Sequence, residues 1–251
     1  MTTLFLIGIG TGNPEHISLE GVRRLNEADL ILLPQKGETK SDLADLRVEI
    51  CDAVLTSPHP PIIPFTMPTR QQDIPYLDAV SLWHQQIAVL WQEAIESQPV
   101  RPQKIAMLIW GDPGLYDSAL RISEKLTPLP DVTVVPGITS LQALCAAHKI
   151  PMNGLASAFQ VMTGRLLRET GFPSEVDRAF VMLDGSCSFQ GLEPEPFDIY
   201  WGAYLGMPNQ ILCSGTVAET AQTIIRMRAE ARAQHGWIMD SYLLVRRGTS
   251  S

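Results

Sequence analysis

Short apolar runs alternate with helical patterns along the first part of the chain. "TLFLIGIG" is an apolar run that ends in glycines, which is typical of a buried parallel strand. "DLILLP" is a second apolar run, closed by Pro34. Between them, "ISLEGVRRLNEA" has apolar residues at helical spacing: Ile17, Leu19, Val22 and Leu25. Strand, helix and strand within about 30 residues predict a βαβ unit.

The pattern of apolar strands followed by helices returns after a long polar segment. Residues 35–103 are polar, punctuated by prolines and partly helical, with "YLDAVSLWHQQIAVLWQEAIES" as the longest predicted helix. "KIAMLIWGDPGLY" is then an apolar strand that ends in a glycine-containing turn. "DVTVVPGITSLQALCAAHKI" predicts a further strand, a Pro-Gly turn and a helix. These units predict an α/β domain with a parallel sheet over residues 1–150.

The pattern changes at "IPMNGLAS", and we place a domain boundary near Pro151. Downstream, "FQVMTG", "AFVMLDG", "DIYWGAYL" and "WIMDSYLLVRR" are predicted strands, and "TVAETAQTIIRMRAEARAQ" is a predicted helix. The chain is therefore expected to form two α/β domains, with the second over residues 151–251.

Composition and charge limit the possible partners. The chain has 251 residues, 45% of them hydrophobic, and a net charge of -8, which argues against general binding to nucleic acid. The start "MTTLFLIGIG" lacks a basic lead and a small-residue cleavage site, and no stretch reaches the roughly 18 apolar residues of a membrane span. The four cysteines lack C-x-x-C spacing, so no metal site is predicted. We expect a cytoplasmic protein that does not bind membranes.

The first glycine turn lacks the known phosphate signatures. Gly8, Gly10 and Gly12 are spaced G-x-G-x-G and are followed by Asn13 and Pro14. A dinucleotide fingerprint needs G-x-G-x-x-G, and a P-loop needs G-K-[ST]. The turn permits close approach of a ligand, and a plain turn with positive φ stays an alternative.

Two further glycine turns change the picture. Residues 110–116 read "WGDPGLY" and residues 136–140 read "PGITS". Asp-Pro-Gly alone is compatible with an ordinary β-turn. In a parallel sheet, however, turns at the carboxyl ends of strands face the ligand crevice. The three turns are therefore predicted to line one cleft.

These motifs, in this order, resemble those of the tetrapyrrole methylases. The set comprises G-x-G-x-G-N, then Ala28-Asp29 before a strand, "GDPGLY", "PGITS" and, at residues 215–220, "GTVAET". The family uses S-adenosylmethionine to methylate uroporphyrinogen and the precorrins, and the diphthine synthases are its relatives. The likeness covers nearly the whole chain and implies a homodimer, with the cofactor in a cleft between two domains.

The resemblance also implies roles for individual residues. S-adenosylmethionine, or the product S-adenosylhomocysteine, would contact both domains through Trp110, Gly111, Asp112, Thr139, Ser140, Leu183, Asp184, Leu205 and Gly206. The opening loop, which contains the first glycine turn, would face the tetrapyrrole through Gly8, Gly10, Thr11, Gly12 and Asn13. Arg165, with Arg168, is a candidate for binding substrate carboxylates, and a solvated pair is the alternative.

Within the family, three segments indicate a particular reaction. "GIGTGNPEHIS", "WGDPGLYDS" and "HGWIMDSYLLVRR" resemble the branch of cobalamin biosynthesis that methylates C1 of precorrin-5 and releases acetate. One alternative is another precorrin or uroporphyrinogen methylase. Alternatives of other classes are a tetrapyrrole-binding module without activity and a nicotinamide-dependent oxidoreductase. The oxidoreductase would need an acidic residue where this chain has Pro34-Gln35.

Methyl transfer mainly requires that two reactants are positioned and water is excluded. Release of acetate requires in addition a base that activates water and donors that stabilise an oxyanion. The predicted catalytic residues are Asp112, Asp184 and Tyr116. His16 and Asp240 are further candidate bases, and Ser140 is a further candidate donor.

Overall fold

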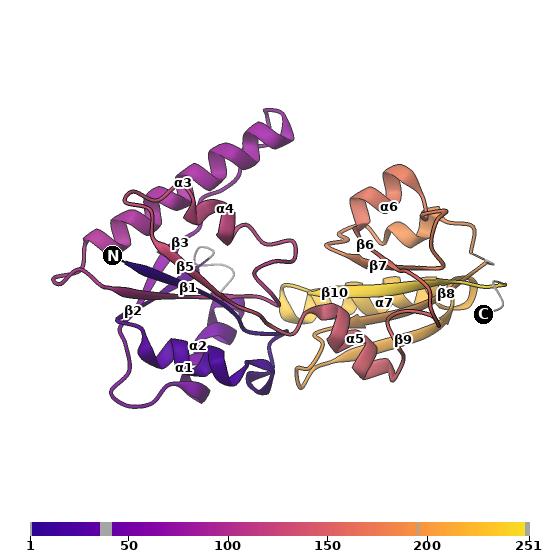
Figure 1. Cartoon of the computed structure of the whole chain (residues 1–251). Helices are drawn as coiled ribbons and strands as arrows, with labels where there is room; N and C mark the ends of the chain where they lie inside the picture. Colours follow the sequence, from indigo (N-terminus) through magenta and orange to yellow (C-terminus); the bar gives the residue numbers. More distant parts are fainter. Residues whose placement is uncertain (1, 36–41, 195, 249–251) are drawn as a thin grey trace. The chain divides into compact units, whose positions relative to one another are not determined.

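The computed structural model describes residues 2–35, 42–194 and 196–248. The chain forms two compact units, Met1–Thr139 and Ser140–Ser251, each held together by contacts among its own residues (Figure 1). The sequence places the boundary near Pro151, whereas helix α5 (Ser140–His148) contacts strands of the second unit. Leu144 of α5 lies against Gly202, where the lack of a side chain makes room for it. The domain limits themselves stay a prediction.

The first unit has the predicted parallel sheet. Its strand order is β3-β2-β4-β1-β5, and the neighbouring strands are paired in parallel. The strands are β1 (Thr3–Gly8), β2 (Leu30–Gln35), β3 (Ile62–Thr66), β4 (Lys104–Ile109) and β5 (Asp131–Val135). Strand β3 comes from the polar segment 35–103, for which no strand was predicted.

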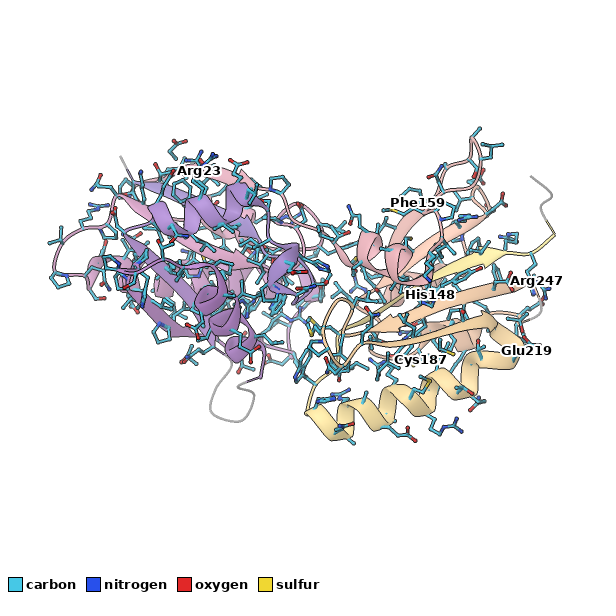
Figure 2. The ribbon with its side chains drawn as sticks, turned by 90° about the horizontal axis from the view of Figure 1, so that it is seen from below. Arg23, His148, Phe159, Cys187, Glu219 and Arg247 are labelled. Carbon is cyan, nitrogen blue, oxygen red and sulfur yellow. The ribbon has the colours of Figure 1, made fainter. Side chains whose placement is uncertain are left out.

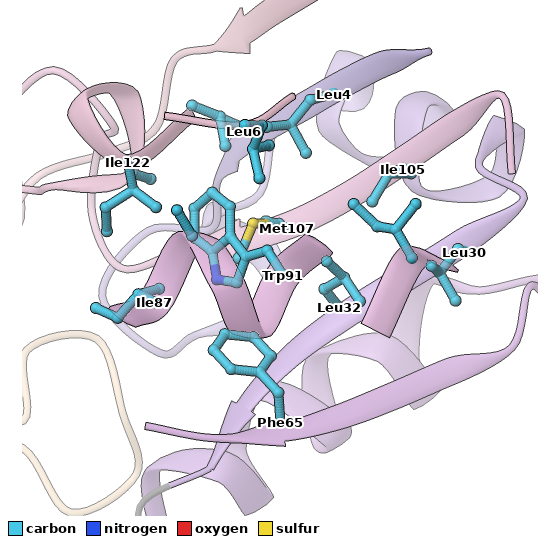
Figure 3. Close-up of a cluster of buried hydrophobic side chains, with 14 of the residues drawn as sticks. Leu4, Leu6, Leu30, Leu32, Phe65, Ile87, Trp91, Ile105, Met107 and Ile122 are labelled. Atoms are coloured by element: carbon cyan, nitrogen blue, oxygen red, sulfur yellow. The ribbon is translucent and has the colours of Figure 1, made fainter. Parts of the chain in front are cut away.

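Helices cover both faces of this sheet, which is why its strands are apolar throughout (Figure 1). Leu4 and Leu6 of β1 pack on one face with Trp91, as Figure 3 shows, while Phe5 and Ile7 pack on the other face. The helices are α1 (Leu19–Glu27), α2 (Asp42–Val54), α3 (Tyr76–Glu96) and α4 (Ala119–Ser123), with a 3-10 turn η1 (Pro14–His16) after the first glycine turn.

The second unit has a mixed sheet in the order β6-β7-β10-β8-β9, in which β6 and β7 are parallel and the other pairs are antiparallel. Its strands are β6 (Gln160–Thr163), β7 (Arg178–Met182), β8 (Phe197–Ala203), β9 (Ile211–Thr216) and β10 (Asp240–Arg246). Besides α5, its helices are α6 (Gly164–Thr170), the 3-10 turn η2 (Ser188–Gly191) and α7 (Val217–His235). The sequence predicted all of these strands except β9, and it did not predict α6.

Local capping explains where the longest helix of this unit begins. The hydroxyl of Thr216 accepts a hydrogen bond from the backbone N–H of Glu219 at 3.2 Å, and Glu219 lies at this end of α7 in Figure 2. None of the helices in the described ranges has the length and hydropathy needed to cross a bilayer.

Candidate functional site

The three predicted glycine turns meet in the first unit. The N–H of Gly111 donates to the carbonyl of Gly10 at 2.8 Å, which joins the first turn to the second. A Cβ on Gly8 would lie 2.6 Å from the backbone nitrogen of Gly137, and a Cβ on Gly137 would lie 2.0 Å from the carbonyl oxygen of Gly111. Only glycine permits this backbone contact. The turns come together as predicted, and their role in ligand binding stays a prediction.

Asp112 ties two of these turns together. Its Oδ1 accepts from the N–H of Gly114 at 2.7 Å, and its Oδ2 accepts from the N–H of Gly137 at 2.9 Å. Both oxygens of the carboxylate are thus bonded to backbone amides. This geometry gives Asp112 a clear structural role, beside the predicted catalytic one.

The opening loop is held by its own polar side chains. Oδ1 of Asn13 accepts from the N–H of Glu15 at 3.0 Å and caps η1. Oγ1 of the buried Thr11 lies 3.0 Å from Nδ1 of His16. Burial lowers the pKa of His16, against the opposing charge of Glu15, so its imidazole is neutral at pH 7. The loop therefore presents a neutral histidine next to residues predicted to face the substrate.

The remaining predicted residues of the second and third turns differ in exposure. Tyr116 is 48% exposed and has a φ of +51°, a strained conformation for a residue with a side chain. Trp110 is half-buried, and its indole N–H has no acceptor among the described residues. At the junction of the units, Thr139 is buried, and so is the hydroxyl of Ser140, which also lacks a partner in the described ranges.

A cavity of about 190 Å³ lies in the first unit at the carboxyl ends of β2, β3 and β4. Its charged lining residues are Arg47 from α2 and Asp117 from the loop before α4. Neither was predicted, although Asp117 falls within the quoted segment "WGDPGLYDS". Arg47 is far from that segment in the sequence, and only the sheet topology brings the two together.

In the second unit, the carboxylate of Asp184 is surrounded by donors. It accepts from the N–H of Ser188 at 2.6 Å, from the hydroxyl of Ser188 at 2.9 Å, from the N–H of Ser186 at 3.0 Å and from the hydroxyl of Tyr242 at 2.7 Å. Burial by itself raises the pKa of Asp184, but these hydrogen bonds outweigh it and lower the pKa below its usual value. Leu183, just before it, is 66% exposed with a φ of +55°. Asp184 therefore fixes the turn that presents Leu183.

Asp240 belongs to a second buried network. Its Oδ2 accepts from Nε of Arg228 and from Nε1 of Trp201, each at 2.9 Å. Arg228 also donates to the carbonyl of Asp184 at 3.1 Å, which links the two networks. Burial raises the pKa of Asp240, against the charge of Arg228. This geometry favours a structural role for the pair.

The other predicted residues of the second unit lie in two places. Leu205 is buried, and the N–H of Gly206 donates to Oε1 of Gln210 at 2.8 Å. Arg165 is exposed and lies 4.0 Å from Glu169 on α6. Within the described ranges, no group of three His, Cys, Asp or Glu side chains could hold a metal ion.

Comparison with known proteins gives the family. Residues 3–221 match the model of the Tetrapyrrole (Corrin/Porphyrin) Methylases. The chain belongs to this family. It is 43% identical to the precorrin-6A synthase [deacetylating] of a Sinorhizobium species, over 97% of this chain and 95% of that protein.

Solved structures agree with this assignment. A cobalamin synthesis related protein (CobF) from Corynebacterium diphtheriae is 38% identical, with a TM-score of 0.82 over 98% of each chain. Uroporphyrin-III C-methyltransferase from Thermus thermophilus, in complex with S-adenosylhomocysteine, is 17% identical with a TM-score of 0.56 over 97% of each chain. The second similarity shows the fold alone. Two α/β units, the first with a parallel sheet, are the fold that the sequence predicts.

Proposed function

We propose that the chain transfers a methyl group from S-adenosylmethionine to C1 of precorrin-5 and releases acetate, which gives precorrin-6A. The observation that carries this proposal is the similarity, over almost its entire length, to the deacetylating precorrin-6A synthase of Sinorhizobium. In this proposal the substrate is a tetrapyrrole. A homodimer and a cytoplasmic location stay predictions.

S-adenosylmethionine is proposed as the cofactor, and when bound it supplies an electrophilic methyl group. Support comes from the family and from the S-adenosylhomocysteine held by the Thermus relative. In the first unit the proposed contacts are Trp110, Gly111, Asp112 and Thr139, and in the second unit they are Ser140, Leu183, Asp184, Leu205 and Gly206. The buried hydroxyl of Ser140 and the indole N–H of Trp110, which lack partners in the described structure, fit a role in holding a polar ligand.

Release of acetate requires a base, and the geometry favours His16. Both oxygens of Asp112 accept backbone hydrogen bonds, and the carboxylate of Asp184 has four donors and a lowered pKa. Burial leaves His16 neutral at pH 7. When its Nδ1 donates to Thr11, its Nε2 keeps a lone pair that can take a proton from water.

The order of bond changes follows from chemistry. Water adds to the acetyl carbonyl, His16 takes the proton, and the bond between the acetyl group and the ring carbon breaks. The electron pair stays on the ring carbon, which becomes the nucleophile that methylation needs. Tyr116 stays a predicted catalytic donor to the oxyanion. The predicted substrate contacts stay Arg165 and the opening-loop residues Gly8, Gly10, Thr11, Gly12 and Asn13. The oxidoreductase alternative is not favoured, because the chain lacks the dinucleotide fingerprint and belongs to a methylase family.

The experiment is incubation with precorrin-5 and S-adenosylmethionine, followed by mass analysis of the tetrapyrrole and assay of acetate. We expect each product molecule to gain one methyl group as one acetate is released. A methylated product that keeps its acetyl group would contradict the proposal and indicate an ordinary precorrin methylase.

The role of His16 is tested by His16→Asn, which can still hydrogen-bond to Thr11 but cannot act as a base. We expect acetate release to fall at least about a hundredfold, while S-adenosylhomocysteine binding stays unchanged. His59→Asn is the control, because His59 is exposed and its Nδ1 contacts the carbonyl of Pro60 at 2.9 Å. Unchanged acetate release in His16→Asn would exclude His16 as the base.

A further inference from the structure

Among the described residues, the cavity of the first unit combines an apolar wall with the cation of Arg47. Phe65, Ile87 and Trp91 belong to the buried core cluster that covers one face of the sheet, and Figure 3 shows them gathered beside Met107 of β4. Arg47 enters from α2, close to the ends of the strands. Pockets for small molecules are mostly apolar with a few placed polar groups, and a guanidinium among them favours an anionic ligand such as a carboxylate.

Arg47 is fixed in position. Its guanidinium lies 5.0 Å from the ring centre of Trp110, and its Nε donates to the carbonyl of Leu108 at 3.3 Å. Burial lowers the pKa of Arg47 to about 10, against the charge of Asp117, so the side chain is still cationic at neutral pH. A planar guanidinium held by stacking is well suited to bind a carboxylate.

Two indole N–H groups provide further donors. Trp91 is 3% exposed, and both it and Trp110 line the cavity. The Nε1 of each is buried without an acceptor in the described ranges, whereas Nε1 of Trp83, also in the lining, donates to the carbonyl of Pro68 at 2.7 Å. A buried N–H without a partner is costly, and a bound acceptor would remove that cost.

The size of the cavity limits what it can hold. At about 190 Å³ it is smaller than the roughly 300–1,000 Å³ of pockets for whole drug-sized ligands. It cannot enclose a macrocycle or the cofactor, but it has room for one substituent. Asp117 is the acidic lining residue, and burial raises the pKa of its carboxyl. A carboxylate at this position opposes an entering anion by like-charge repulsion.

We propose that this cavity binds one carboxylate arm of the tetrapyrrole substrate, with Arg47 as its cationic partner and the indole N–H groups of Trp91 and Trp110 as donors. That this arm belongs to a tetrapyrrole rests on the proposed function, since uroporphyrin-derived macrocycles carry acetate and propionate side chains. The same carboxylate chemistry would also suit the acetate that the reaction releases.

The first experiment uses propionate as the probe and needs no turnover. The chain has five tryptophans, so proton–nitrogen NMR gives five indole N–H signals, which single Trp→Phe variants assign. We expect propionate to shift the signals of Trp91 and Trp110 in a saturable way, while uncharged propionamide does not. The signals of Trp201 and Trp237, in the second unit, should stay unchanged.

Variants test whether the charges of Arg47 and Asp117 control propionate binding. Arg47→Gln should weaken propionate binding at least about tenfold, and Asp117→Asn should tighten it, because it removes the like charge. Asn keeps an oxygen for the N–H of Ala119, which Asp117 accepts at 2.6 Å. The control is Arg70→Gln, since Arg70 stacks on Tyr76 at 5.0 Å, outside the cavity lining. Equal shifts with propionamide, or in Arg47→Gln, would overturn the proposal.

The second experiment separates the two sources of carboxylate. With precorrin-5, Arg47→Gln should raise KM about tenfold or more and leave kcat nearly unchanged, because the arm is bound equally in the ground and transition states. An unchanged KM with weaker inhibition by acetate would assign the cavity to the released product and overturn the assignment to an arm. Propionate binding in a protein that does not turn over precorrin-5 would instead reject the proposed function and leave the carboxylate site standing.

Discussion

Each unit has an aspartate in the turn that follows a buried strand, Asp112 after β4 and Asp184 after β7, and the two turns are built differently. Asp112 accepts two backbone N–H groups, one from its own turn and one from Gly137 in the next turn. Asp184 is buried and accepts from two side-chain hydroxyls and two backbone N–H groups. Similar strand–turn sequences therefore lead to a junction of backbones in one unit and to a buried charge network in the other.

The two turns are therefore sensitive to different substitutions. The junction of the first unit depends on glycines that allow backbones to touch, so an added methyl group is its most damaging change. The network of the second unit depends on a desolvated charge with all its donors in place, so loss of that charge is its most damaging change.

The largest expected effect is that of Gly137→Ala. Its Cβ would lie 2.0 Å from the carbonyl oxygen of Gly111 and 2.8 Å from Cα of Gly8, and these backbone atoms cannot move aside as a flexible side chain would. We expect a loss of about 4 kcal/mol in the free energy of unfolding, measured by urea denaturation.

The matched control is Gly185→Ala, in the turn of Asp184. A Cβ there meets no described atom within 4 Å, so stability should change by less than about 0.5 kcal/mol. If Gly137→Ala lost under about 1 kcal/mol, the close contact of the three turns would be wrong.

A smaller loss, of about 3 kcal/mol at pH 7, is expected for Asp184→Asn, because an amide cannot satisfy the donors around a carboxylate. Since the pKa of Asp184 is lowered in the folded state, its contribution is complete above the unfolded pKa of about 3.9 and is lost as the pH falls through the folded pKa. The difference between wild type and variant should therefore shrink below about pH 4.

Urea denaturation at several pH values measures this difference. Asp198→Asn is the control, since Asp198 lies 3.5 Å from the half-exposed Arg247, which is labelled in Figure 2. It should cost about 0.5 kcal/mol or less. A difference for Asp184→Asn that stays constant down to acid pH would show that its charge does not stabilise the turn.

The smallest expected effect on stability is that of Asp112→Ala, about 1 kcal/mol, because its two hydrogen bonds are in a half-buried turn. We expect the variant to bind S-adenosylhomocysteine more weakly in calorimetry, since it loosens the turn proposed to contact the cofactor.

Asp29→Ala is a close control at the other end of β4. Oδ2 of Asp29 accepts from the N–H groups of Gln103 and Lys104 at 2.8 and 2.9 Å, so a comparable number of backbone bonds is lost. This variant should lose similar stability and keep its affinity for S-adenosylhomocysteine. If Asp112→Ala also keeps that affinity, Asp112 is only a turn residue.

Elements with a strong local pattern were predicted and the weaker ones were not. β1, β2 and β4 are apolar runs buried on both faces, and α7 has a capping Thr216 with Glu219 three positions later. By contrast, β9 lies at the sheet edge with no fully buried residue. The short helix α6, like β3 with its internal proline, also gives too brief a signal to stand out.

The family, the parallel sheet and the three glycine turns could be predicted from the amino-acid sequence, because each depends on neighbours along the chain or on motifs in a fixed order. By contrast, the contacts of Gly137 with Gly8 and Gly111, the hydrogen bond from Tyr242 to Asp184 and the cavity that Arg47 shares with Asp117 are seen in the folded chain alone. These pairs are far apart in the sequence, and a polar residue's burial, and with it the shift of its pKa, depends on what the fold packs around it.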